Sequence, residues 1–181
     1  TAMNYVLSVK AGAKGHTYLT EDMLVEETNA FFNDNAAMEC SISKDFLEYY
    51  STQFNALEIN TTFYGMPTAE RLLNFYNRSH GRLKFSIKLN RLLTHEIDRN
   101  WKTNADTFKS ALTPLLETSS LASVLIQFPE SFDYTPQNRQ YLADLLKAMA
   151  PIPCVVEFRH RNWIRQSVFK GLEIRNTGIV F

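Results

Sequence analysis

Residues 123–129 read SVLIQFP, and this short run decides the class of fold. Val124, Leu125 and Ile126 follow one another without the apolar and polar alternation of a half-exposed strand. A strand that is apolar on both faces is typical of a parallel sheet with helices on either side. Pro129 ends the run, since proline cannot donate a hydrogen bond to a neighbouring strand. The stretch therefore predicts one central strand of a parallel α/β protein.

Similar runs lie on both sides of this strand, and helical patterns separate them. Thr68 and Thr135 are predicted helix N-caps, and Pro114 is expected to kink or split the helix that contains it. The predicted strands are 4–10, 56–64, 83–90, 122–129, 153–160 and 177–181, and the predicted helices are 21–32, 44–54, 68–80, 105–118, 135–150 and 163–172.

The strands after residue 55 recur about every thirty residues, each followed by a helix, which indicates repeated βαβ units. Two parallel architectures fit this pattern, an open doubly wound sheet and a closed barrel. A complete eight-stranded barrel takes about 250 residues, whereas the sequence has 181. We therefore expect an α/β, TIM-barrel-like (β/α) fold that is incomplete. No linker-like segment divides the sequence, so a single domain over residues 1–181 is expected.

The composition narrows the classes of partner. The 19 basic and 19 acidic side chains cancel, so no overall charge favours nucleic acid or an anionic membrane. No apolar stretch approaches the roughly 20 residues of a membrane span, and the first residues lack the pattern of a secretory signal. Cys40 and Cys154 have neither metal-ligand nor disulfide-framework spacing. A cytoplasmic protein with reduced thiols is expected.

Polar residues appear where four of the predicted strands end. In a parallel sheet the carboxyl ends of the strands lie on one edge, and that edge carries the ligand site. Residues two apart in a strand point to the same face. These strand-end residues are Glu58 and Asn60, Ser86 and Lys88, Gln127, and Glu157 and Arg159.

A structural interpretation of the same residues stays open. Glu58 could pair with Lys88, and Glu157 with Arg159, as ion pairs inside the fold. Buried pairs of this kind often add no net stability, which favours a functional role for them. Arg91, Lys88, Arg159 and Arg161 could also bind a phosphate or a carboxylate, and arginine offers two parallel hydrogen bonds for this purpose.

The segment NRLLTHEIDRNW, residues 90–101, carries the histidine with the clearest chemical potential. His95 could act as a general acid or base, because an imidazole titrates near neutral pH. A surface or packing role is the alternative for a histidine in a loop. His160 follows Arg159 and is expected to point to the opposite side. Tyr64 and Trp163 lie just beyond strand ends, where they either line a pocket or fill the core.

Metal and cofactor motifs are not found in the sequence. Glu58, His95, Glu157 and His160 are suitable ligand types, yet no H-x-H, H-x-x-x-H or C-x-x-C spacing occurs. The sequence also lacks a G-x-S-x-G elbow and the glycine-rich loops that bind nucleotides. We expect no cofactor, with a divalent metal as the less favoured alternative.

Four segments together resemble domain of unknown function 72, the YecE-like family. They are FLEYYSTQFNALEINTTFYGMP (46–67), LKFSIKLNRLLTH (83–95), VLIQFPESF (124–132) and VVEFRHRNW (155–163), which set residues 45–181 apart from an unmatched segment 1–44. The resemblance implies a TIM-barrel-like fold similar to xylose isomerases and apurinic endonucleases, and it implies no established activity. Proteins of this family normally open with a strand that carries a G-T-S-G-W type motif, and they continue beyond a segment like GIVF to complete the barrel. Neither of these parts has a match in this sequence. The motif positions that it implies are Glu58, Asn60, Thr62, Phe63, Tyr64, Lys88, Thr94, His95, Gln127, Glu157, Arg159, His160 and Trp163.

Three functions remain after this comparison. The favoured hypothesis is an enzyme that acts on a small phosphorylated or carboxylated substrate, with Glu58, Lys88, His95 and Glu157 as catalytic residues. The expected substrate-binding residues are Asn60, Tyr64, Arg91, Gln127, Arg159 and Trp163. The alternatives are a protein that binds or processes nucleic acid, by analogy with the endonuclease barrels, and a binding module without catalysis.

Overall fold

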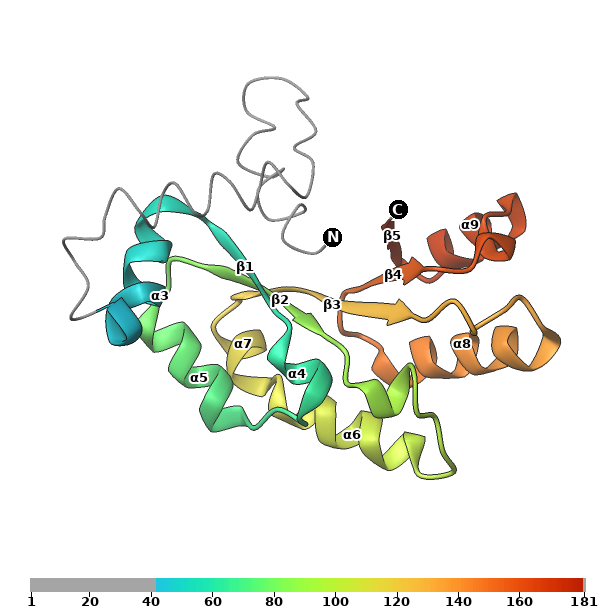
Figure 1. Cartoon of the computed structure of the whole chain (residues 1–181), viewed down its shortest axis with the longest axis horizontal. Coiled ribbons are helices and arrows are strands. Elements are labelled where there is room, and N and C mark those ends of the chain that lie inside the picture. Colours follow the sequence, from blue (N-terminus) through green and yellow to red (C-terminus); the bar gives the residue numbers. More distant parts are fainter. Residues whose placement is uncertain (1–41, 181) are drawn as a thin grey trace, which may run out of the picture. The chain divides into compact units, whose positions relative to one another are not determined.

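The computed structural model describes residues 42–180 (Figure 1). The strand and helix predicted over 4–10 and 21–32, together with Cys40, lie outside the described residues. The described helices are α3 Ile42–Gln53, α4 Thr61–Tyr64, α5 Ala69–Arg78, α6 Trp101–Ala111, α7 Thr113–Glu117, α8 Pro136–Met149 and α9 Gln166–Glu173, with 3₁₀ turns η2 Arg91–Leu93 and η3 Arg161–Trp163. The strands are β1 Ala56–Ile59, β2 Lys84–Lys88, β3 Leu121–Phe128, β4 Cys154–Phe158 and β5 Gly178–Val180.

Local sequence signals explain where several helices begin and end. The Thr68 hydroxyl accepts a hydrogen bond from the Arg71 N–H at 3.2 Å, and the Thr135 hydroxyl accepts one from the Asn138 N–H at 3.2 Å. Both threonines therefore cap helices as predicted. The helix that contains Pro114 is split, because α6 ends at Ala111 and α7 begins at Thr113.

The strand predicted over residues 56–64 is shorter than expected. Strand β1 ends at Ile59, and residues 61–64 form the short helix α4 instead of extending the strand. The buried Thr62 hydroxyl donates to the carbonyl of Ile59 at 2.9 Å or to that of Lys88 at 2.6 Å, both within its reach. This local side-chain bond competes with an extended backbone, so the β-branched pair Thr61 and Thr62 did not continue the strand. Placing Asn60 on the strand was wrong, since it precedes α4.

The five strands form one sheet in the order β1-β2-β3-β4-β5. The pairs β2 with β3, β3 with β4, and β4 with β5 are parallel, which confirms the predicted parallel α/β class. The chain divides into two compact units. The described residues of the first are 42–58 and 75–84, and those of the second are 59–74 and 85–180. The single-domain expectation stays a prediction.

Within the second unit, the two faces of strands β2 to β4 differ in chemistry. Register partners in a parallel sheet point to the same side, so the rows of partners define the faces. One face is apolar and buried, and it carries Phe85, Ile87, Val124, Ile126, Phe128, Cys154 and Val156. The opposite face carries Ser86, Lys88, Ser123, Leu125, Gln127, Val155 and Glu157. The run Val124, Leu125 and Ile126 is buried on both faces of β3, as its apolar sequence predicted, while Ser123 and Gln127 add polar groups to the second face.

Helices of the second unit cover the apolar face (Figure 1). Tyr141 of α8 packs edge-on against Phe128 of β3, with 6.5 Å between ring centroids, and α6 packs against α8. The Tyr141 hydroxyl donates to the carbonyl of Leu93 at 2.7 Å, which ties α8 to the turn η2. Burial raises the pKa of Tyr141 well above its ordinary value of 10.0. The hydroxyl therefore stays a donor, and the turn that precedes His95 is anchored to the helix layer.

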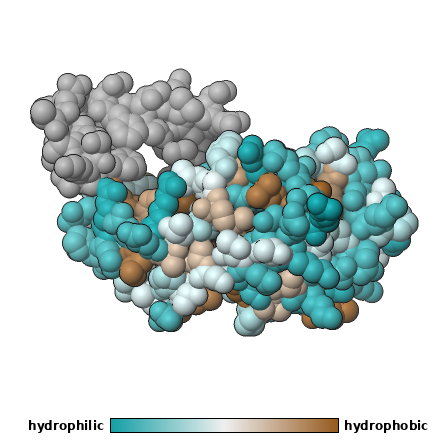
Figure 2. All heavy atoms as spheres, turned by 90° about the horizontal axis from the view of Figure 1, so that it is seen from below, coloured by the Kyte–Doolittle hydropathy of each residue, from teal (hydrophilic) through white to brown (hydrophobic). Residues whose placement is uncertain are grey.

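One face of the described part is mostly hydrophilic (Figure 2). On the face in Figure 2, hydrophilic side chains dominate and hydrophobic ones form small separate patches. None of the helices in residues 42–180 combines the length and the apolar character that crossing a bilayer requires.

Candidate functional site

Three predicted site residues share the polar face of the sheet in the second unit. Lys88 is the register partner of Leu125, and Gln127 is the partner of Glu157. Because Leu125 and Gln127 lie two apart on β3, their side chains point to the same face, and so do those of Lys88 and Glu157. Parallel strands place these residues toward the carboxyl edge of the sheet. The structure thus brings together an ammonium, a carboxamide and a carboxylate.

A cluster around the Phe63 ring forms one side of this edge. The Lys88 ammonium lies over the ring, with Nζ 5.1 Å from the centroid. The His95 ring meets the same ring edge-on, with 4.9 Å between centroids. Tyr64, which is 75% exposed, also contacts Phe63 edge-on at 5.1 Å. One aromatic ring therefore holds the predicted cation and the predicted acid-base residue beside each other.

His95 is poised as a neutral imidazole. The burial of part of its ring lowers its pKa below the ordinary value of 6.5, and the charge of Lys88 lowers the pKa further, while Glu96 opposes this shift. Its Nδ1 lies 2.9 Å from the hydroxyl of the buried Thr94. This contact occupies one ring nitrogen and orients the ring, so Nε2 is the nitrogen that a ligand would meet.

Two buried polar side chains fix the backbone beneath this cluster. Asn90, only 2% exposed, donates from Nδ2 to the carbonyl of Thr62 at 2.8 Å and accepts from the Leu92 N–H at 3.1 Å. The Thr62 hydroxyl in turn reaches the Lys88 carbonyl. Helix α4, the end of β2 and turn η2 are therefore held together by hydrogen bonds, and these are the elements that carry Phe63, Lys88 and His95.

The second charged group at the edge is an ion pair. The carboxylate of Glu157, which is almost fully buried, forms an ion pair with Arg159, with 2.9 Å between Oε1 and Nε. Arg159 follows β4, and its side chain is 45% exposed. The proposed pairing of Glu157 with Arg159 is thus confirmed. The pair holds a guanidinium at the carboxyl edge, where one side of it meets solvent.

Among the described residues, no hydrogen bond or ion pair joins the side chain of Asn60 or Arg91 to the cluster around the Phe63 ring, and a third predicted site residue belongs to the other unit. Asn60 is exposed at the start of α4 and makes no capping hydrogen bond through its side chain. Arg91 is exposed and pairs with Glu96 at 3.4 Å. Glu58 lies on β1 in the first unit, and its Oε1 is shielded from solvent.

Trp163 occupies a core position. It is 1% exposed, and its ring stacks on Phe158 and Phe132 with centroids 4.5 and 5.4 Å away. Its indole N–H donates to the carbonyl of Phe132 at 2.6 Å. Of the two interpretations that the sequence left open for Trp163, this position agrees with packing.

The loops after β3 and β4 meet at a polar cluster that sequence reasoning missed. Asp133 accepts from Nδ2 of Asn162 at 3.0 Å and from the Tyr134 N–H, and these two bonds lower its pKa. Nδ1 of His160 lies 3.4 Å from Asp133 and accepts from the Asn162 N–H at 3.2 Å. In the sequence, both loops directly follow predicted strands, which indicates that they lie at the same edge of the sheet. This position does not show that Asp133 pairs with Asn162 and His160.

The described residues offer no ready metal site or reactive thiol. Among residues 42–180, no three His, Cys, Asp or Glu side chains gather in a way that would hold a metal ion. Cys154 is buried in the apolar face, and burial raises its pKa to about 12. A thiol in this state is a packing residue rather than a nucleophile.

Comparisons with known proteins agree with the motifs. The model of the family described as "Protein of unknown function DUF72" matches residues 32–181, starting earlier than the motif region at Asp45. The UPF0759 protein YunF of Bacillus subtilis is 34% identical over 126 residues, which are 67% of this chain and 45% of YunF. The chain therefore spans about half the length of this curated relative.

Two solved structures show the same fold. A DUF72 family protein of Enterococcus faecalis is similar with a TM-score of 0.67 and 21% identity, over 77% of this chain and 59% of that one. A DUF72 family protein of Thermotoga maritima gives a TM-score of 0.65 and 27% identity, over 75% and 54%. The TIM-barrel-like class of these proteins agrees with the fold predicted from the sequence. By its sequence and by its fold, this chain belongs to the DUF72 family.

Proposed function

We propose that the carboxyl edge of this sheet binds a small phosphorylated or carboxylated molecule, and that the protein is an enzyme in which His95 transfers a proton. The observation that carries this proposal is the shared Phe63 ring, which has the Lys88 ammonium 5.1 Å away and the His95 imidazole 4.9 Å away. A cation beside a neutral imidazole combines anion binding with proton transfer in one place.

Charge and geometry support an anionic ligand. Lys88 is half-buried and lies against an aromatic ring, so an anion there would meet less competition from water than at an exposed lysine. Arg159 supplies a second cation, which Glu157 orients. In the proposed mechanism Lys88 and Arg159 bind the anion, and Phe63 and Tyr64 form its wall.

The chemistry assigns a different role to each titratable group. Thr94 occupies Nδ1 of His95, so Nε2 would take a proton from the substrate or give one to it. The lowered pKa keeps this nitrogen unprotonated at neutral pH, which suits a general base. Glu157 is engaged with Arg159 and would position that guanidinium rather than act as the base.

Calorimetry with inorganic phosphate tests the binding step. We expect one saturable site, and a Lys88→Met variant that binds phosphate at least about tenfold more weakly, because one charge-assisted contact contributes about 1.5–3 kcal/mol. Lys147→Met, which removes an exposed lysine from the last turn of α8, is the matched control and should bind like the wild type. Equal affinities of the wild type and Lys88→Met would overturn the proposal.

Turnover is tested with a panel of phosphate esters, carboxylate esters and oligonucleotides. We expect His95→Gln to lose turnover while it binds phosphate within about threefold of the wild type, a difference below 1 kcal/mol. A wild-type protein that binds phosphate and turns over no member of the panel would contradict the enzymatic part and favour a binding module. Turnover confined to oligonucleotides, with salt-sensitive binding, would favour the nucleic-acid alternative.

A further inference from the structure

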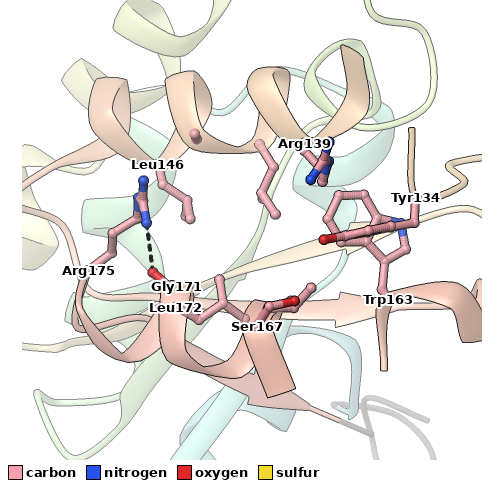
Figure 3. A pocket seen from close by; sticks show the side chains of 11 residues that line it. Tyr134, Arg139, Leu146, Trp163, Ser167, Gly171, Leu172 and Arg175 are labelled. Atoms are coloured by element: carbon pink, nitrogen blue, oxygen red, sulfur yellow. Dashed lines mark hydrogen bonds between the residues drawn. The ribbon is translucent and has the colours of Figure 1, made fainter. Parts of the chain in front are cut away.

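A pocket lies between helices α8 and α9, in the helix layer rather than on the polar face of the sheet (Figure 3). Its volume is about 150 Å³, which is the size of a cavity that holds one benzene ring. Its residues come from α8, from α9 and the turn that follows it, and from the loops after β3 and β4. They are Tyr134, Arg139, Leu142, Ala143, Leu146, Trp163, Ser167, Val168, Gly171, Leu172 and Arg175.

The floor of this pocket is apolar. Leu142, Leu146, Val168 and Leu172 are buried side chains that face one another across the two helices. Trp163 adds one edge of its buried indole. Gly171 and Ala143 leave the space open, because neither residue projects a large side chain into it. A ligand with a compact apolar body would fill this volume and remove its carbons from water.

The ends of the pocket are cationic and polar. Figure 3 shows Arg175 at one end and Arg139 with Tyr134 at the other. Nη1 of Arg175 donates to the carbonyl of Gly171 at 2.8 Å, which holds its guanidinium beside the pocket. The Arg139 guanidinium lies 5.0 Å from the centre of the Tyr134 ring. Each guanidinium has five N–H donors, so these contacts leave donors for an anion.

Tyr134 adds a hydroxyl between two arginines at the polar end of the pocket. Hydrogen bonds from Ser167 and Arg139 lower the pKa of its hydroxyl, and the charges of Arg139 and Arg165 act in the same direction. Arg165 lies on the Tyr134 ring, with 4.6 Å between its guanidinium and the ring centre. Two arginines therefore surround one phenol at the mouth, which gives this end a positive potential.

We propose that this pocket binds a small carboxylate with an apolar body of about six carbons, such as an aromatic or short aliphatic acid. The apolar floor would take the hydrocarbon part, and Arg139 or Arg175 would bind the carboxylate. Lys88 and His95 contribute nothing to this pocket, so the proposal does not rest on the proposed function.

Benzoate is a suitable probe, and benzyl alcohol is its uncharged counterpart of similar size. In calorimetry or ligand-observed NMR with the full chain, we expect one saturable benzoate site. Ala143→Leu and Gly171→Leu fill the pocket from opposite helices and should each weaken benzoate binding at least about tenfold. At least one of Arg139→Met and Arg175→Met should weaken benzoate about tenfold and leave benzyl alcohol within about twofold, because only the charge contact is lost. Unchanged benzoate binding in both variants would overturn the role of the guanidinium groups. Arg82→Met, an exposed arginine that does not line the pocket, is the matched control.

Thermal unfolding of each variant confirms that the fold is kept, and leucine suits both helical positions. Benzoate binding that survives both filling variants would overturn the inference. Benzoate binding that is lost in Lys88→Met and kept in Ala143→Leu would overturn it as well, while supporting the site on the sheet. Failure of phosphate to bind at Lys88 would leave the outcome at this pocket unaffected.

Discussion

At the scale of single residues, the neighbours of His95 set the orientation and the pKa of its imidazole. Its ring is oriented by Thr94, rests against Phe63 and lies in the field of Lys88. Partial burial of the ring and the charge of Lys88 lower the pKa of His95, which favours the neutral imidazole that a general base needs. The role of His95 therefore follows from the cluster and can be tested by changing Lys88.

The pKa of His95 should respond to the loss of Lys88. In Lys88→Met we expect the His95 pKa to rise, because one of the causes that lower it is removed. NMR titration of the imidazole proton shifts in both proteins measures this change. Lys147→Met should leave the pKa of His95 where it is in the wild type. An identical pKa in the wild type and Lys88→Met would show that the two side chains do not interact.

The same shift links stability to pH. Folding lowers the His95 pKa, so the contribution of the neutral ring is fully present above the unfolded value of about 6.5. It is lost as the pH falls from there through the folded pKa, because the unfolded chain then binds the proton more readily. Urea unfolding between pH 7.5 and 5 should show a smaller loss of stability for His95→Gln than for the wild type. An equal loss in both proteins would contradict this link.

Sequence alone could identify some of these residues and not others. Lys88, Gln127 and Glu157 were predicted because the position of a residue at a strand end is a local property. The pairing of Asp133 with Asn162 could not be predicted, since it joins two loops whose approach is decided by tertiary packing. Trp163 also lies just past a strand end, and only its neighbours in space show that it packs in the core.

At the scale of elements, helix α4 shows how one hydroxyl can end a strand. Thr62 is 3% exposed, and its hydroxyl donates either to the carbonyl of Ile59 at the end of β1 or to that of Lys88 at the end of β2. Propensity favoured a longer strand through two threonines, and this buried bond outweighed it. The shortened strand allows Phe63 to meet Lys88 and His95 within the second unit.

Thr62→Val should therefore destabilise the protein by about 1–3 kcal/mol, because buried carbonyls lose a donor while the shape of the side chain is kept. Thermal or urea unfolding measures the change. Thr107→Val is the matched control, since the Thr107 hydroxyl bonds to the carbonyl of Thr103 on the exposed side of α6. The control should change stability by about 0.5 kcal/mol or less. Equal losses in both variants would contradict the structural role of Thr62.

At the scale of the whole molecule, the sequence predicted the parallel class because apolar runs and helical patterns alternated along the chain. It did not predict the difference between the two faces of the sheet. That difference depends on the register that sets Gln127 beside Glu157, and register is fixed by packing between strands. The family relatives agree on the fold, and the chain spans about half of the curated relative's length.

The central claim is that the carboxyl edge of the sheet forms an anion-binding site. An NMR titration of the isotope-labelled protein with phosphate tests this claim most directly. In this titration, we expect the signals of Lys88, Thr94 and His95 to shift together with one dissociation constant. In Lys88→Met, the signals of Thr94 and His95 should stay still. Shifts confined to the α8 and α9 pocket, or scattered over exposed lysines without saturation, would contradict the claim.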